Sequence, residues 1–88
     1  MFGYVYIIQS QKNGRYYVGS SEDPVRRLNE FHNKSKVKAT MYLTPWKLVF
    51  SQRYEEIADA RKVEYKLKQK KSRVILELVI KNNKLDIK

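Results

Sequence analysis

The chain has 88 residues, enough for one domain with a small core and too few for two independent cores. It contains no cysteine, which excludes disulfides and thiolate metal sites, and no apolar run approaches the ~18–20 residues of a membrane span. Nineteen Lys and Arg against nine Asp and Glu give a net charge of +10, and the interleaved aromatic residues favour nucleic acid over a membrane surface as the partner.

The first predicted element is an antiparallel hairpin of residues 3–9 and 15–19, two runs rich in β-branched and aromatic residues. The Asn13-Gly14 pair between them is a typical turn signal. Four of the seven tyrosines fall within the two runs. The hairpin therefore brings several phenols together.

The register of this hairpin decides how close two of its tyrosines lie. Pairing Tyr6 with Gly19 places Tyr17 opposite Ile8, on the same face as Tyr6 and diagonal to it, within about 7–8 Å. A turn with only the two Asn-Gly residues at its tip would separate Tyr6 from Tyr17 by about 13 Å. The sequence pattern alone leaves both registers open.

A short helix is predicted over residues 24–32, with Asp23 as its N-cap and Pro24 in its first position. Its inward stripe is expected to hold the residues at helical spacing, Val25, Leu28 and His32. Residues 33–45 follow, with three lysines and no acid, and are predicted to form a basic loop.

Residues 46–54 are predicted to form a third strand that pairs with one of the first two. Alternation along this strand places Val49 on one face and three residues on the other, Trp46, Leu48 and Phe50.

Two helices are predicted after this strand. The first begins behind Glu55 and Glu56 and ends at the lysines of residues 66–71, as the helix dipole prefers. Ser72 caps the second, which ends at Asn82-Asn83. Its apolar stripe is expected to consist of Val74, Ile75, Leu78 and Val79.

The predicted fold class is α+β, in the order strand, strand, helix, strand, helix, helix. We expect a small three-stranded antiparallel sheet with the helices laid on one face. Residues 1–83 are expected to form the domain and residues 84–88 a weakly ordered tail. The N-terminus lacks the charged lead and apolar core of a signal peptide, so we expect a cytoplasmic protein.

Glu64 is the most informative single charge, because from Arg61 to Arg73 it is the one acid among seven Lys and Arg. It falls on the apolar stripe of its helix, where a carboxylate is costly unless something pairs with it. Two explanations stay open: a salt bridge with Lys68 at i+4, or a ligand for a hard cation such as Mg²⁺.

The other candidates also have structural explanations when each is taken alone. Tyr6 and Tyr17 fit packing residues, since a pKa of about 10 makes tyrosine a poor base at neutral pH. Arg27 fits a solvated helix residue, and His32 fits a hydrogen-bonded core histidine. Gly19 fits either a strand end or a point where a phosphate backbone approaches closely.

Taken together, these residues resemble the GIY-YIG nuclease family, in particular its small standalone members related to the N-terminal catalytic module of the nucleotide-excision-repair endonuclease. PWKLV, which opens the third strand, also looks like those members. The signatures span about residues 3–80 and are GYVYII with Tyr6, YYVGSS with Tyr17, DPVRRL with Arg27, HN with His32 and ARKVEYKLK with Glu64.

Two departures from the family pattern are visible. The first signature has Tyr4-Val5 where the family name has Gly-Ile. His32 stands five residues after Arg27, one more than in the standalone members, and Phe31 occupies the usual place. The shift looks like a one-residue insertion.

The resemblance implies a metal-dependent DNA endonuclease, structure-selective or of low sequence specificity, with DNA repair or recombination as its setting. Glu64 would hold one divalent metal, Mg²⁺ or Mn²⁺, and Tyr17 with Tyr6 would position and deprotonate the attacking water. Arg27 would clamp the phosphate charge, and His32 would assist by hydrogen bonding. Such a site needs Tyr6 and Tyr17 as direct or diagonal neighbours, so the resemblance implies a hairpin loop wider than the Asn-Gly pair. Further substrate contacts are expected at Gly19, Arg26, Lys36, Lys38 and Lys68.

Two other functions stay open at this point. The same basic face would serve a nucleic-acid-binding module that is catalytically weak or inactive, which the shifted histidine favours. A protein-interaction adaptor would bind DNA negligibly at physiological salt. The sequence shows no recognition helix or zinc site for reading bases, which supports low sequence specificity. Whether a separate targeting protein is a partner stays open.

Overall fold

The computed structural model describes residues 1–34, 36–38 and 40–85. The predicted fold class and element order are confirmed. In the described part of the chain, no helix is long and apolar enough to cross a membrane. The elements are β1 (Gly3–Ser10), β2 (Tyr16–Ser21), α1 (Pro24–Arg27), the π-helix η1 (Leu28–His32), β3 (Trp46–Tyr54), α2 (Ile57–Lys70) and α3 (Arg73–Asn82).

The sheet is antiparallel in the order β2-β1-β3, so β1 is central and β2 is an edge strand. Tyr6 pairs with Gly19 and Ile8 with Tyr17, which confirms the wide-loop register. Ser10 sets that loop, because its backbone N–H donates to the Arg15 carbonyl at 2.8 Å and its hydroxyl accepts from two turn N–H groups. The Asn-Gly signal thus marks the turn but not its length.

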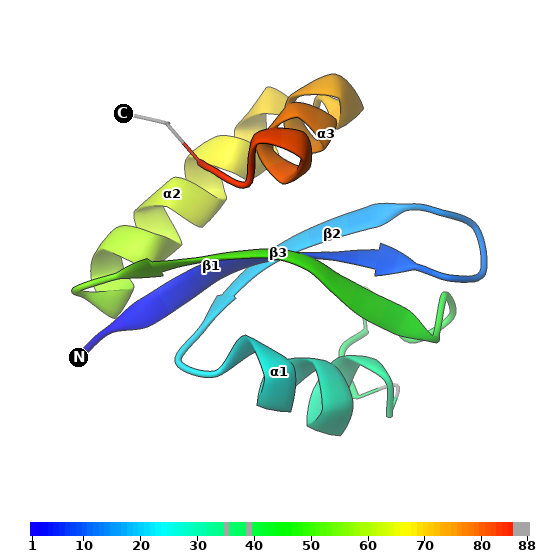
Figure 1. Cartoon of the computed structure of the whole chain (residues 1–88). Coiled ribbons are helices and arrows are strands. Elements are labelled where there is room, and N and C mark those ends of the chain that lie inside the picture. The colour runs from blue at the N-terminus through cyan, green and yellow to red at the C-terminus, as the bar shows by residue number, and fades with distance from the viewer. Residues whose placement is uncertain (35, 39, 86–88) are drawn as a thin grey trace.

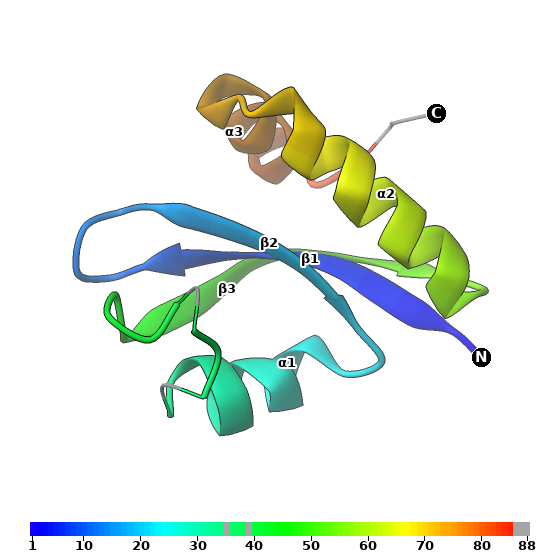
Figure 2. The same ribbon diagram turned by 180° about the vertical axis from the view of Figure 1, so that it is seen from behind.

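Helices cover both faces of the sheet, and the expectation of one covered face was wrong. Figure 1 shows α2 and α3 on one side and α1 on the other, and Figure 2 shows the same layers from behind. The reason lies in β1, where Val5, Tyr6, Ile7 and Ile8 are all buried. A central strand that is apolar on both sides needs a layer on each.

A β-bulge in β3 changes which side chains share a face. Ile7 pairs with Phe50 but Ile8 pairs with Leu48, so Val49 is skipped. Phe50 therefore joins the core on the α2 side, while Trp46 and Leu48 pack with Tyr6 and Ile8 on the α1 side. The prediction that Trp46, Leu48 and Phe50 share one face was wrong because strict alternation does not survive a bulge.

The helix after the hairpin starts as predicted, since the Asp23 carboxylate accepts from the Arg26 N–H at 3.1 Å. It then widens into a π turn, in which the Asn33 N–H donates to the Leu28 carbonyl at 2.9 Å. The extra residue in this turn brings Leu28 and His32 into line on the sheet. Val25 is left off that line and is 56% exposed, so its predicted place in the stripe was wrong.

The last helix begins and ends where predicted, with a Ser72 cap and Asn83 in the left-handed conformation. Its buried stripe is displaced by one residue: Val74 and Leu78 are exposed. Residues 74–76 and 78–80 are all apolar, so the pattern fits two adjacent stripes and only tertiary packing chooses between them. The stripe that packs on the core consists of Ile75, Leu76, Val79 and Ile80.

The segment after α3 is not weakly ordered at Leu85. This side chain is 4% exposed within the core of the α2 side. Its backbone N–H and carbonyl both bond to the Gln52 side chain, at 2.9 and 3.1 Å. The rest of the predicted tail, residues 86–88, lies outside the described residues.

Candidate active site

The candidate residues come from both faces of the sheet and meet at the free edge of β2. Tyr6, Tyr17 and His32 lie on the α1 side, where their rings contact one another. Ser20 pairs with Val5 and so faces α2, which supplies Glu64. An edge strand has no neighbour on its outer side, so side chains from the two faces can approach each other there.

Gly19 makes room for Tyr6 to reach that edge. A Cβ at this position would overlap the Tyr6 hydroxyl and the ring carbon Cζ. The space in front of Gly19 is therefore filled by the Tyr6 ring. This packing, rather than a strand end, is the structural reason for the glycine.

The buried side of the site is a chain of hydrogen bonds that starts at Tyr6. Its hydroxyl lies 2.7 Å from His32 Nε2, and His32 Nδ1 lies 3.0 Å from Thr40 Oγ1. Thr40 Oγ1 donates to the Val37 carbonyl at 3.3 Å, so it accepts from Nδ1–H. His32 Nε2 then accepts from the Tyr6 hydroxyl, which fixes both the tautomer and the phenolic proton.

Burial keeps both members of this pair uncharged. It lowers the pKa of His32 to about 4, with the positive charge of Arg27 adding to the effect. Burial also raises the pKa of Tyr6 to about 12, with Tyr17 adding to the rise and Arg27 opposing it. At neutral pH Tyr6 therefore keeps its proton and donates it to a neutral imidazole.

The π turn explains how the shifted histidine still reaches the site. One extra residue between Arg27 and His32 would rotate the ring away in a regular α-helix. The wider turn absorbs that residue and leaves His32 fully buried beside Tyr6. Phe31, in the position that the histidine takes in the standalone members, instead lies under the Arg27 guanidinium at 4.6 Å.

Tyr17 is the more accessible of the two phenols. Its ring is half-buried, 5.3 Å from the His32 ring and 6.4 Å from the Trp46 ring, centroid to centroid. The Lys68 ammonium lies 5.0 Å from the Tyr17 ring centroid. The same ammonium pairs with Glu64 Oε2 at 2.7 Å. Tyr17 and Glu64 therefore border one space, with Lys68 between them.

Glu64 has two partners, each on one carboxylate oxygen. Oε1 accepts from the Ser20 hydroxyl at 2.5 Å and Oε2 from Lys68. The ion pair expected from the i, i+4 spacing is present, and the side chain is still 20% exposed. The carboxylate is oriented from two sides and accessible from a third.

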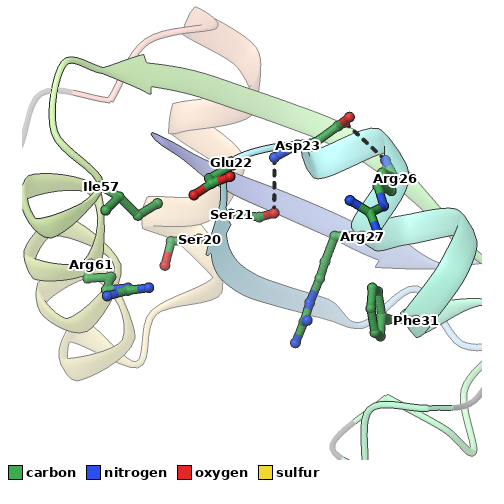
Figure 3. Close-up of a pocket in the computed structure, with 9 residues that line it drawn as sticks. All are labelled: Ser20, Ser21, Glu22, Asp23, Arg26, Arg27, Phe31, Ile57 and Arg61. Atoms are coloured by element: carbon green, nitrogen blue, oxygen red, sulfur yellow. Dashed lines mark hydrogen bonds between the residues drawn. The ribbon is translucent and has the colours of Figure 1, made fainter. Parts of the chain in front are cut away.

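A cleft of about 350 Å³ opens beside Ser20, and we call it the arginine cleft. In Figure 3 the guanidinium groups of Arg27 and Arg61 lie on the same side as the Ser20 hydroxyl, while the Glu22 and Asp23 carboxylates lie on the other. Its lining consists of Ser20, Ser21, Glu22, Asp23, Arg26, Arg27, Phe31, Ile57 and Arg61.

Three residues of the site were missed at the sequence level. Arg61 could have been found, because it stands three residues before Glu64 and so shares its helix face. Ser20 directly follows Gly19 in the second signature. Its pairing with Val5 turns its side chain toward α2. Thr40 had no sequence signal, because it lies in a loop whose path a sequence pattern does not predict. In the structure the Trp46 indole N–H donates to the Thr40 carbonyl at 2.9 Å and so holds that loop in place.

The remaining predicted contacts are more scattered. Arg26 lies at the arginine cleft and pairs with Glu30 at 2.9 Å. Lys36 and Lys38 are exposed in the loop after His32, outside the described lining of that cleft. Lys68 lies at the centre of the site.

The donor set suits a hard divalent cation that keeps most of its waters. The described residues contain no cluster of three or more His, Cys, Asp or Glu. Glu64, with the Ser20 hydroxyl beside it, offers one accessible carboxylate. Mg²⁺ is commonly bound by one or two carboxylates together with waters and substrate phosphate, so these residues fit it.

Comparison with known proteins shows the family of the chain. Residues 2–83 match the GIY-YIG catalytic domain. The chain is also 32% identical over 78 residues to the UPF0213 protein SSP2268 of Staphylococcus saprophyticus subsp. saprophyticus, an alignment covering 84% of this chain and 94% of the relative. Both matches take in nearly the whole chain. It therefore belongs to the GIY-YIG catalytic-domain family, a family of nucleases that act on DNA.

Proposed function

We propose that this protein is a metal-dependent endonuclease that hydrolyses DNA phosphodiester bonds. One observation supports the proposal: the Lys68 ammonium contacts both the Glu64 carboxylate and the Tyr17 ring, so a carboxylate and a phenol border one space. Arg27 borders the adjoining cleft with its guanidinium. A scissile phosphate in that space would meet all three groups.

The chain's own residues divide the work between the two faces. Tyr6 keeps its proton for His32, so Tyr17 is assigned as the general base that takes a proton from the attacking water. Tyr6 and the His32 chain fix the Tyr17 ring by packing, and the Tyr6 hydroxyl, which Arg27 also approaches, would help to orient the water. Arg27 neutralises the charge that builds on the phosphate oxygens.

Glu64 is assigned as the ligand of a divalent metal, Mg²⁺ or Mn²⁺. When bound, the metal would polarise the phosphate and stabilise the leaving oxygen. Ser20 would hold the carboxylate in position from the β2 side. Lys68 would have to leave Oε2, because both cations compete for the same oxygen.

Low sequence specificity follows from the kind of side chains at the site. Arginine and lysine bind the phosphate backbone, which carries no base information. Substrate choice would then rest on strand geometry, which agrees with a role in DNA repair or recombination. A targeting partner would supply further selection.

The test is cleavage of plasmid, branched, nicked and single-stranded DNA with and without Mg²⁺ or Mn²⁺. Wild-type protein should nick at least one of these substrates only when metal is present. Glu64→Gln should lose this activity while its thermal unfolding is unchanged. Glu55→Gln is the matched control, because Glu55 is exposed and pairs with Arg53 on the other side of the fold.

A second candidate is a nucleic-acid-binding module without catalysis, and the Glu64–Lys68 ion pair favours it. If Lys68 were a permanent partner of Glu64, no metal would enter. Such a protein would shift DNA in a binding assay and leave it intact at every metal concentration. That result would overturn the endonuclease assignment, and so would persistent cleavage by Glu64→Gln.

A further inference from the structure

A second hollow lies on the opposite side of Glu64 from the arginine cleft. It has a volume of about 800 Å³, and we call it the lysine groove. It is formed where β2 and the end of α2 meet the start of α3. Its lining consists of Arg15, Tyr16, Tyr17, Val18, Leu67, Lys68, Lys71, Ser72, Arg73 and Leu76.

The two hollows follow one seam between β2 and α2. Along β2, Tyr16 and Tyr17 line the groove and Ser20 lines the cleft. Along α2, Arg61 lines the cleft and Lys68 lines the groove, with Glu64 midway between them. The candidate metal ligand therefore stands at the junction of two hollows rather than at the bottom of one.

The charges along this seam suit a polyanion. No acid is present among the described residues that line the lysine groove. In the arginine cleft the Arg27 and Arg61 guanidinium groups lie to one side and the Glu22 and Asp23 carboxylates to the other (Figure 3). Arg61 shares α2 with Glu64 and Lys68, so positive charge continues along this helix from the cleft into the groove.

The groove also offers a surface on which a base can stack. The Arg73 guanidinium lies 4.6 Å from the Tyr16 ring centroid, and its Nη1 donates to the Gly14 carbonyl at 3.1 Å. These two contacts hold the Arg73 guanidinium over the Tyr16 ring. Base stacking on such groups is typical of proteins that bind single strands.

We propose that a single polynucleotide strand lies along this seam, from the arginine cleft across Glu64 into the lysine groove. At 1.5 Å per residue, Arg61 stands about 4.5 Å before Glu64 and Lys71 about 10.5 Å after it. At about 3.4 Å per nucleotide, the rise of a fully stacked strand, this corresponds to at most roughly one phosphate on the Arg61 side and three on the Lys71 side, and to fewer if the strand is extended. The inference rests on the proposed function only in taking a nucleic acid as the ligand.

Binding without metal tests the track separately from cleavage. We would measure fluorescence anisotropy of labelled single-stranded oligonucleotides with the Glu64→Gln protein, adding Arg61→Gln, Lys71→Gln or Lys62→Gln. Lys62 is the control, because it is exposed on α2 outside both hollows. Each of the first two changes should reduce the slope of log affinity against log salt by about 0.7.

That change in slope is measurable. Between 50 and 200 mM salt, the parent should lose about 2.6-fold more affinity than Arg61→Gln or Lys71→Gln, since a fourfold salt change raised to the power 0.7 is about 2.6. Lys62→Gln should match the parent. Equal effects at all three positions, or equal affinity for duplex and single strand, would overturn the proposal in favour of diffuse attraction or duplex binding.

Neutral linkages locate the two ends of the track. A single uncharged methylphosphonate linkage is placed at each position of a six-nucleotide strand in turn. The position at which Arg61→Gln no longer weakens binding is the phosphate that Arg61 contacts, because the charge that it would pair with is already absent there. The corresponding linkage for Lys71→Gln should lie about two to four positions away, depending on how far the strand is extended. If the two variants respond to the same linkage, the track is refuted even when metal-dependent cleavage is observed. If they respond to separate linkages and no cleavage is observed, only the nuclease assignment is refuted.

Discussion

The Tyr6–His32–Thr40 chain predicts that this protein loses stability in a defined acid range. His32 is fully buried and its pKa falls to about 4, against about 6.5 for an unfolded histidine. Between these two pH values the histidine is protonated in the unfolded chain and neutral in the folded chain. Stability is therefore complete above pH 6.5 and is lost as pH falls toward 4.

The size of this loss follows from the two pKa values. A difference of about 2.5 units at 1.36 kcal/mol per unit gives about 3 kcal/mol between pH 7 and pH 4. Small domains have a free energy of unfolding of about 5–15 kcal/mol, so the loss is a large share of the total. Other acidic groups add their own pH dependence, so a comparison with a variant is needed to isolate His32.

The assay is urea unfolding at pH 7, 5.5 and 4, followed by fluorescence of the buried Trp46, for wild type and His32→Gln. Glutamine can still bond to the Tyr6 hydroxyl but does not titrate, so the variant's pH dependence should be flatter by about 3 kcal/mol. His32 is the one histidine of the chain, so NMR titration reads its pKa directly if the variant unfolds. Parallel pH curves, or a histidine that titrates near pH 6.5, would refute the hydrogen-bond chain.

Two further predictions concern the edge of β2 and the metal ligand. Gly19→Ala should cost about 1–3 kcal/mol of unfolding free energy, because its Cβ overlaps Tyr6, and the cost in urea unfolding should shrink in a Tyr6→Leu background. An undiminished cost there would place the strain elsewhere. Lys68→Met should tighten Mn²⁺ binding about two- to fivefold in calorimetric titration, since it removes the cation that holds Glu64. Weaker binding would instead make Lys68 a support for the carboxylate.

Local patterns predicted the strands and helix ends well. The three strands, the N-caps at Asp23 and Ser72 and the helix end at Asn83 depend on neighbours within a few residues, and each is found where predicted. The hairpin register was left open by the strand pattern and was narrowed by the family's need for neighbouring tyrosines. In the structure Tyr6 lies opposite Gly19, which agrees with that argument.

The errors arose where a nonlocal contact decides the outcome. The bulge at Val49 and the π turn before His32 each add one residue, and a sequence pattern cannot show where the backbone absorbs it. The Leu85 backbone is held by the Gln52 side chain, and the whole of α2 and α3 lies between these two residues in the sequence. For the site, residue types were visible in the sequence, but the partners of Glu64 and His32 were fixed by packing.

The position of β2 explains why a fold this small can assemble a site from two layers. A packed layer stands about 10 Å from the sheet that it covers, so groups in layers on opposite faces of the sheet are too far apart to act on one phosphate. At the outer edge of β2 that separation disappears, because no further strand stands between α2 and the Tyr6 side. Tyr6 belongs to the central strand and must cross β2 to reach this edge. The Tyr6 ring passes over β2 at Gly19. A side chain at this position would therefore displace the Tyr6 phenol from the edge at which Glu64 lies.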